Sequence, residues 1–240
     1  MGGTTLRIGR RFCGPPLSGN GGYVAGLLAR GLGSTDCVVT LRSPPPLDEE
    51  LRLEHQGAEV SLFAGERLIA SAERAGLEVD VPVPPAFDQA AQAESRFTGW
   101  NGHVFPGCFV CGPERAAGDG LRIFPGRMED RAGSQVAATW IPDPSLAGSN
   151  GLLKPEFIWS ALDCPGYFAA EPNSGPAVLG RLGVAIHRCP SITDRLIVTG
   201  WPIESSGRKH LMGTALHDDA GMLVAAATAT WIAIEAPGWQ

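Results

Sequence analysis

The sequence lacks the excess of basic residues that binding to nucleic acid or to an anionic membrane requires. Its 240 residues include 19 Lys and Arg against 25 Asp and Glu, which gives a formal net charge of -6. No cationic field is therefore available to attract a phosphate backbone or acidic lipid head groups. We expect neither nucleic acid nor a membrane among the partners of this chain.

Segments that could target or cross a membrane are also lacking. The first residues, MGGTTLRIGRR, contain no apolar core of a secretory signal, and Leu6 stands where N-myristoylation requires Ser or Thr. The longest nearly apolar run, 222–234, is too short to span a bilayer and is predicted to be a buried strand. Without a signal, the 6 cysteines are expected to be reduced core thiols, which predicts a cytoplasmic protein.

A second pair of metal ligands at a recognisable spacing is missing as well. Cys108 and Cys111 form a Cys-x-x-Cys pair, which supplies only half of a tetrahedral zinc site. Cys164 and Cys189 do not form a matching second pair, so the sequence predicts no bound metal and no cofactor. No histidine has a spacing that pairs it with a nucleophile, and ordinary strand and loop positions are predicted for His55, His103, His187, His210 and His217.

What the sequence does contain is the same order of elements on both sides of a Pro-rich segment. Residues 80–103 lack sustained helix or strand periodicity, apart from a possible short helix in DQAAQAES, and are predicted to be a linker. On each side, a loop with Gly and Asn leads into a helix that begins near Gly21 or Pro155. We therefore expect two duplicated units, residues 1–79 and 104–240.

Each unit is predicted to be α+β, with an antiparallel sheet wrapped around one buried helix. Both helices are apolar nearly all round, which indicates burial, and Gly33 is a natural stop for the first. No helix separates the strands that follow, so their pairing should be antiparallel. Pro202, inside a strand pattern, predicts a bulge or an edge. The expected strands span 36–43, 50–56, 58–64 and 67–75, then 120–126, 134–141, 177–188, 194–203, 208–217 and 222–234.

Two motifs resemble those of a known superfamily. GCFVCGPERAAGDGLRIFPG (107–126) resembles the opening of many hotdog-fold thioesterase-like domains, where a Cys-x-x-Cys-Gly turn leads through Gly-Leu into the first strand. Asn20-Gly21-Gly22-Tyr23 is similar to the His/Asn-Gly-Gly start of the central helix in that superfamily. The resemblance covers most of the chain outside the linker. It implies a double hotdog, with two antiparallel sheets each wrapped around a central buried helix.

The resemblance also implies an acyl-CoA thioesterase-like hydrolase with one site shared between the units. In the phenylacetyl-CoA-thioesterase-like branch, an Asp lies eight residues after the first Gly of the helix start. That position is Asp163 in the second unit but Ala29 in the first. Gly21 and Gly22 offer free N–H groups at a helix start, where an oxyanion is favoured, whereas Pro155 has no N–H. One composite catalytic site is expected, with Asp163 as base or nucleophile.

Asn20, Tyr23 and Glu156 flank these positions and are expected to bind the substrate, a small-molecule acyl thioester of CoA. Structural roles remain open: Asn20 as a helix cap, Glu156 as a partner of the helix dipole, and Asp163 as a carboxylate at a helix break caused by Pro165. Another alternative is a protein that binds acyl-CoA or a fatty acyl group without cleaving it, because fold does not define function. A homodimer of double hotdogs is compatible with either function.

Overall fold

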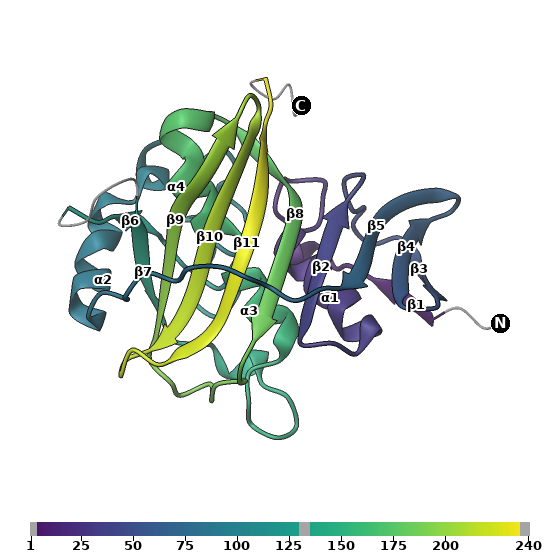
Figure 1. The fold of residues 1–240 in the computed structure, drawn as a ribbon, viewed down its shortest axis with the longest axis horizontal. Coiled ribbons are helices and arrows are strands. Elements are labelled where there is room, and N and C mark those ends of the chain that lie inside the picture. Colours follow the sequence, from purple (N-terminus) through teal and green to yellow (C-terminus); the bar gives the residue numbers. More distant parts are fainter. Residues whose placement is uncertain (1–3, 130–134, 236–240) are drawn as a thin grey trace.

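The strands of this chain form one continuous antiparallel sheet (Figure 1). A computed structural model describes residues 4–129 and 135–235. Within these residues the sheet has 11 strands in the spatial order β1-β3-β4-β5-β2-β8-β11-β10-β9-β7-β6. They are β1 (Thr4–Arg7), β2 (Asp36–Leu41), β3 (Glu50–Gln56), β4 (Glu59–Ala64), β5 (Arg67–Arg74), β6 (Gly126–Arg127), β7 (Val136–Trp140), β8 (Ala177–Ile186), β9 (Leu196–Ser206), β10 (Lys209–Asp218) and β11 (Leu223–Ala233).

Two different helices pack against the two parts of the sheet. The α-helices of the described residues are α1 (Gly21–Leu32), α2 (Phe87–Ala93), α3 (Pro155–Ala161) and α4 (Cys164–Ser174). Helix α1 packs against β2 to β5, and α4 packs against β7 to β11. The prediction of antiparallel strands around buried helices is therefore confirmed. Short 3-10 helices occupy Arg10–Phe12, Glu94–Arg96, Thr98–Asn101 and Pro144–Leu146.

The two predicted sheets are joined into one. Strand β2 pairs antiparallel with β8, with Val39 opposite Leu182, so the strands of residues 36–74 continue into those of 177–233. Helix α1 lies behind β2 in Figure 1, beside the joint. Segments far apart in sequence consequently meet where β2 and β8 run side by side.

Helix α1 begins and ends where the sequence predicts. The side-chain oxygen of Asn20 accepts a hydrogen bond of 2.9 Å from the Tyr23 N–H, which caps the helix start. Gly33 ends the helix in the left-handed conformation, with φ of 64°, which costs glycine little because it has no Cβ. Val24 and Leu28 are fully buried beneath the sheet. These local signals fix where α1 starts and ends.

The second predicted helix is broken into two. Helix α3 ends at Ala161, and α4 begins at Cys164 with Pro165 in its first turn. Pro165 cannot donate to the carbonyl of Ala161, and its ring would clash with that carbonyl in a continuous helix. Asp163 therefore stands at the break, in the position that caps α4.

The predicted strand over 120–126 is wrong apart from its last residue. The N–H groups of Leu121 and Ile123 donate to the carbonyls of Phe109 and Val110 rather than to a sheet neighbour. Arg122 between them has a positive φ of 55°, which is incompatible with a strand. Only the two-residue strand β6 forms at the end of this stretch. These bonds tie the segment to the Cys-x-x-Cys turn instead.

The short helix suggested within the predicted linker is present as α2. Ala90 and Ala93 of this helix are buried against Ala137 of β7 and Ile197 of β9. The bulge predicted at Pro202 is confirmed, because the β9–β10 register shifts so that Leu211 lies opposite Glu204 while Met212 lies opposite Pro202. The segment 80–103 is thus partly packed on the second half of the sheet.

Two glycines, one turn apart, bring α1 into backbone contact with α3. A Cβ on Gly22 would lie 2.7 Å from the carbonyl oxygen of Trp159, and a Cβ on Gly26 would lie 2.6 Å from the Cα of Glu156. Real Cβ atoms do not approach backbone this closely, so both positions require glycine. The close approach sets the start of α1 beside the break between α3 and α4.

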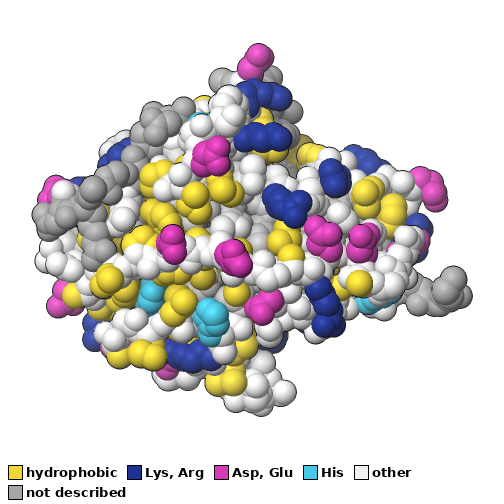
Figure 2. Space-filling model, viewed as in Figure 1, with side chains coloured by type: hydrophobic (Ala, Val, Ile, Leu, Met, Phe, Trp, Pro, Cys, Tyr) yellow, Lys and Arg dark blue, Asp and Glu magenta, His cyan; other side chains and the backbone are white. Residues whose placement is uncertain are grey.

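The outer surface agrees with the absence of a cationic field. On the face shown in Figure 2, acidic and basic side chains are interspersed with hydrophobic ones rather than gathered by sign. No helix in the described residues is long and apolar enough to cross a bilayer.

Candidate functional site

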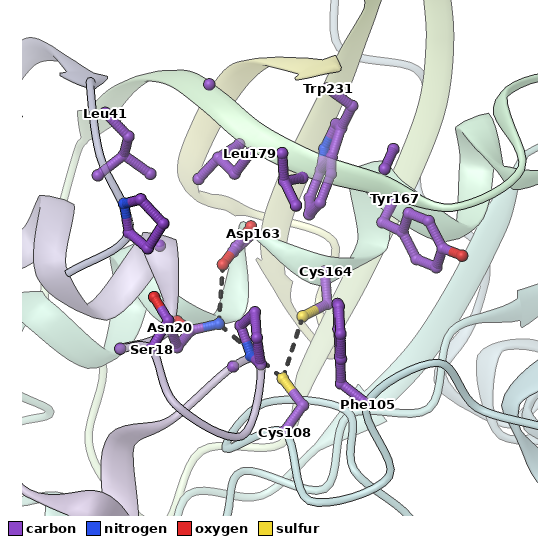
Figure 3. A pocket seen from close by; sticks show the side chains of 18 of the residues that line it. Ser18, Asn20, Leu41, Phe105, Cys108, Asp163, Cys164, Tyr167, Leu179 and Trp231 are labelled. Carbon is purple, nitrogen blue, oxygen red and sulfur yellow. Dashed lines mark hydrogen bonds between the residues drawn. The ribbon is translucent and has the colours of Figure 1, made fainter. Parts of the chain in front are cut away.

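A cavity of about 360 Å³ lies where the two halves of the chain meet (Figure 3). This volume falls within the range of about 300–1,000 Å³ found for small-molecule sites. The walls come from the start of α1, the break between α3 and α4, the Cys-x-x-Cys turn, and strands β8 and β11. Lining residues include Asn20, Gly21, Leu41, Asp163, Leu179 and Trp231.

Asp163 is buried in the cavity wall, and one of its two oxygens is held by hydrogen bonds. Its Oδ2 accepts bonds from the side-chain Nδ2 of Asn20 at 2.8 Å and from the Gly22 N–H at 2.9 Å. The residue is only 2% exposed, and its Oδ1 has no hydrogen-bond partner among the described residues. The carboxyl is therefore fixed in orientation through Oδ2, while Oδ1 is buried without a partner among the described residues.

Burial raises the pKa of Asp163 to about 7. The hydrogen bonds from Gly22 and Asn20 oppose this shift because they favour the charged form, whereas the nearby Cys108 thiol group adds to it. A carboxyl group with a pKa near neutrality can both accept and return a proton under ordinary conditions.

The two glycines at the start of α1 have different positions. The Gly22 N–H is already used by Asp163, and the residue is buried against α3 rather than lining the cavity. Gly21 lines the cavity, and within the described residues its N–H donates to no acceptor. As the first residue of α1, it has no acceptor within the helix either. Gly21 is the glycine that can bind an incoming carbonyl oxygen.

Asn20 connects the helix cap with the site. Its Oδ1 caps α1, which leaves Nδ2 to donate to Asp163 and to lie 4.0 Å from the sulfur of Cys108. The cap and the predicted site role of Asn20 are therefore compatible.

Two residues predicted to bind substrate lie elsewhere. Tyr23 stacks on Phe12, with ring centroids 4.0 Å apart, and burial raises its pKa to about 12. Glu156 is buried and accepts a 2.9 Å bond from Arg30. Neither is among the residues that line the cavity. Tyr23 follows Gly21 by two positions in a helix that turns by roughly 100° per residue, and Glu156 belongs to α3, where it packs against α1. The structure therefore places Tyr23 and Glu156 outside the cavity that Asn20, Gly21 and Asp163 line.

A cluster of three buried thiols lies next to Asp163. The sulfurs of Cys108, Cys111 and Cys164 all lie within 4.8 Å of one another, and Cys108 and Cys164 are 3.8 Å apart. Hydrogen bonds from the other two thiols and from the backbone hold the pKa of Cys108 well below its usual range. Burial raises the pKa of Cys111, and hydrogen bonding to Cys108 raises that of Cys164. These three thiols are the described side chains best suited to hold a soft metal.

His103 also belongs to this region, which corrects its prediction as an ordinary loop residue. Its Nε2 lies 3.2 Å from the sulfur of Cys111, and it lines the cavity. Burial lowers the pKa of the imidazole, so its neutral form is favoured. His103 and Cys111 are only eight residues apart, but no metal-ligand or catalytic spacing in the sequence indicates this contact.

The apolar wall of the cavity was not predicted residue by residue. Leu41 of β2, Leu179 of β8 and Trp231 of β11 come from strands that the sequence did predict. Strand alternation indicates an inward face but not which inward residues surround a cavity. Arg42, exposed next to β2, also lines the cavity and was not singled out.

Comparisons with known proteins give relatives by structure alone. Neither a family model nor a curated protein sequence matches this chain. The tesB protein of Mycobacterium avium subsp. paratuberculosis superposes with a TM-score of 0.61 at 13% identity, covering 90% of this chain and 88% of its own. A candidate thioesterase from Novosphingobium aromaticivorans gives a TM-score of 0.68 at 12% identity, covering 96% and 95%.

A third structure, a candidate thioesterase II from Thermobifida fusca, gives a TM-score of 0.64 at 16% identity and covers 96% of this chain and 93% of its own. All three likenesses extend over nearly the whole of both chains, so they concern the complete arrangement of helices and strands. At such low identity they establish the fold and leave the activity to be argued from the site. This chain has the hotdog fold.

Proposed function

We propose that this chain is a double hotdog that hydrolyses acyl-CoA thioesters. The observation that carries the proposal is the position of Asp163: one oxygen is held by Asn20 and Gly22, and the other is without a partner in the described residues, in a cavity that Gly21 also lines. A fixed carboxylate beside a helix-start N–H supplies both the base and the oxyanion donor that thioester hydrolysis requires.

The double-hotdog architecture is supported by the way the sheet is shared. Helix α1 lies against β2 to β5, α4 lies against β7 to β11, and the two parts of the sheet join through the pairing of β2 with β8. The proposed units are residues 1–79 and 104–240. Under this arrangement, Gly21 comes from the first unit and Asp163 from the second, so neither unit alone has a complete site.

The proposed reaction uses each group once. The carbonyl oxygen of the thioester accepts a hydrogen bond from Gly21, where the positive end of α1 favours the negative charge that develops. Asp163 takes a proton from water as the water oxygen attacks the carbonyl carbon. The carbon–sulfur bond then breaks, and the proton passes to the departing thiolate. Direct attack by the carboxylate, followed by hydrolysis of the anhydride, fits the same geometry.

The substrate class follows from the lining of the cavity. Leu41, Leu179 and Trp231 form an apolar wall that suits an acyl group. Arg42 is exposed and lines the same cavity, where its guanidinium can bind an acidic group of the carrier, as in the phosphates of CoA. An assay of free CoA release from acyl-CoAs of varied chain length tests the proposal directly.

Reversing the charge of Arg42 should weaken substrate binding without affecting the chemical step. We expect Arg42→Glu to raise KM for an acyl-CoA by about tenfold with kcat little changed, because a charge-assisted hydrogen bond contributes about 1.5–3 kcal/mol. Steady-state kinetics at two salt concentrations measure this. Arg208→Glu, in an exposed turn and not among the residues that line the cavity, is the matched control. An unchanged KM for Arg42→Glu would exclude Arg42 from binding the carrier.

Proline at position 21 should remove the oxyanion donor while keeping the helix. Proline is favoured in the first position of a helix, as Pro155 is in α3, and the extended Asn20 backbone (φ −60°, ψ 130°) suits a residue before proline. Loss of one oxyanion donor typically lowers kcat by about 10²–10³-fold. We expect a loss of this size for Gly21→Pro.

Gly21→Ala is the control, because it adds a Cβ but retains the N–H. That Cβ would lie 2.9 Å from Leu179 Cδ2 and 3.0 Å from Leu41 Cδ1, the ends of flexible side chains that can move. Turnover by both variants, with circular dichroism to confirm folding, separates crowding from loss of the donor. Equal activity of the two variants would assign the oxyanion site to other groups.

A protein that binds an acyl thioester without cleaving it is the alternative. The observation that favours it is the bond between Asp163 and Gly22, which already occupies one of the two helix-start donors. Calorimetric titration with a non-hydrolysable acyl-CoA analogue, together with the turnover assay, distinguishes the two functions. Binding without turnover of any tested acyl-CoA would support the alternative.

A further inference from the structure

We propose that Cys108, Cys111 and Cys164 bind a zinc ion whose fourth coordination position opens onto the cavity. The site goes beyond the proposed hydrolase function and does not depend on it. The three thiols come from two distant parts of the chain, the Cys-x-x-Cys turn and the start of α4. Sequence spacing alone predicts no zinc, because the Cys-x-x-Cys pair supplies only half of a tetrahedral site.

The distances between the sulfurs fit a tetrahedral zinc ion. With zinc–sulfur bonds of about 2.3 Å, tetrahedral geometry places ligand sulfurs about 3.8 Å apart. The sulfurs of Cys108 and Cys164 are 3.8 Å apart, and all three sulfurs lie within 4.8 Å of one another. A change in side-chain torsion that moves the Cys111 sulfur by about 1 Å is enough to bring it to the same spacing.

The Cys-x-x-Cys turn is shaped as a rigid pair of ligands. Its two sulfurs, those of Cys108 and Cys111, lie within 4.8 Å of each other. The Gly112 N–H closes the turn on the Cys108 carbonyl at 2.9 Å, and a Cβ at Gly112 would lie 2.5 Å from that oxygen. Only glycine fits this position, so the turn holds both sulfurs on one side.

The third ligand is delivered by the helix break. Cys164 is the first residue of α4, so its side chain lies at the start of that helix, directly after the break. Because Pro165 prevents α3 from continuing, the chain turns at Asp163 and Cys164 is directed toward Cys108. The close-up in Figure 3 shows the sulfurs of Cys108 and Cys164 facing one another.

His103 supports the cluster through a hydrogen bond rather than as a ligand. Its Nδ1 accepts a 2.9 Å bond from the Phe105 N–H, so in the neutral ring the proton is on Nε2. That N–H then points to the sulfur of Cys111 at 3.2 Å. A hydrogen bond of this kind stabilises a thiolate and orients the ligand, which is how groups next to metal ligands act.

Three thiolates leave one tetrahedral position for another ligand. All three cysteines line the cavity, so a water molecule, or a thiol that enters the cavity, can occupy that position. Thiolates select soft metals, and a four-iron cluster would require a fourth cysteine. Among the described residues, Cys13, Cys37 and Cys189 do not belong to the cluster. Zinc is therefore the metal that the donor set fits best.

The test is the metal content of the full chain. Protein expressed with added zinc should be purified under reducing conditions without chelator. It should contain about one zinc per chain, because the three cysteines form a single site. Cobalt(II) in place of zinc should give a thiolate-to-cobalt charge-transfer absorption. Cys108→Ser, Cys111→Ser and Cys164→Ser should lose both signals, whereas Cys189→Ser, a half-buried cysteine outside the cluster, should keep them.

His103→Ala should retain the metal but bind it about 10–100-fold more weakly in a chelator competition. Complete loss of zinc from this variant would indicate that His103 is the fourth ligand. It would contradict the proposal that the fourth coordination position opens onto the cavity. The wild-type titration decides the proposal even if a serine variant does not fold. Reduced wild-type protein that binds neither zinc nor cobalt would overturn the zinc site. A Cys108–Cys164 disulfide that persists under the reducing conditions of purification would overturn it too.

Discussion

Replacing Asp163 with asparagine is expected to lower turnover of an acyl-CoA by about 10²–10⁴-fold, the usual contribution of general acid–base catalysis. The amide has nearly the shape of the carboxyl, and its oxygen can still accept the bonds from Asn20 and Gly22 that Oδ2 accepts now. What the variant loses is the basic oxygen in the cavity. A loss of activity with an intact fold would therefore assign the chemistry to this side chain.

An assay of CoA release measures the turnover, and a thermal unfolding curve shows whether the fold is intact. The melting temperature should not fall, because burying a neutral amide costs less than burying a charge. Asp36→Asn, on an exposed residue of β2, is the matched control and should be fully active. Wild-type turnover by Asp163→Asn would refute the proposed mechanism and leave the carboxyl a structural role at the helix break.

Replacing Gly26 with alanine is expected to destabilise the fold by about 1–3 kcal/mol, the usual cost of overpacking a core. The added Cβ would lie 2.6 Å from the Cα of Glu156 and 3.0 Å from the Cβ of Trp159. A backbone atom inside α3 cannot move without the helix, so α1 and α3 must separate. Better helix propensity recovers at most about 1 kcal/mol. Activity should fall too, because the separation moves Asp163 away from Gly22.

Gly31→Ala tests the same substitution in the same helix without the clash. A Cβ there would make ordinary contacts, 3.6 Å from Val60 and 3.7 Å from Leu53, so the variant should be as stable as the wild type or more stable by up to about 1 kcal/mol. Unfolding in denaturant, monitored by tryptophan fluorescence, compares the two variants. Equal stability of Gly26→Ala and Gly31→Ala would show that the contact of α1 with α3 yields easily.

The sequence predicted the elements that depend on neighbouring residues. The start of α1 follows from Asn20 as a cap, its end from Gly33, and the bulge in β9 from Pro202. The strands after each helix were also correct apart from shifts at their ends. The stretch 120–126 failed because its N–H groups bond to Phe109 and Val110, and local strand periodicity cannot reveal such partners.

The candidate site was predicted only in part. Asn20 and Gly21 were chosen from a helix-start motif and Asp163 from the family resemblance, and all three line one cavity. Glu156 was chosen from the start of the second helix, yet it binds Arg30, because its direction depends on how α3 packs on α1. Whether these residues carry catalysis stays a prediction that the substitutions above test.

The sequence by itself determined where helices start, stop and break, because caps, glycine and proline act on backbone groups within about one helical turn. Only the tertiary structure decided which distant groups meet: Asp163 with Gly22, Cys164 with Cys108, and β2 with β8. Those contacts depend on the packing of whole elements, such as the glycine contact of α1 with α3. No local pattern encodes the partner of a side chain that lies far away along the chain.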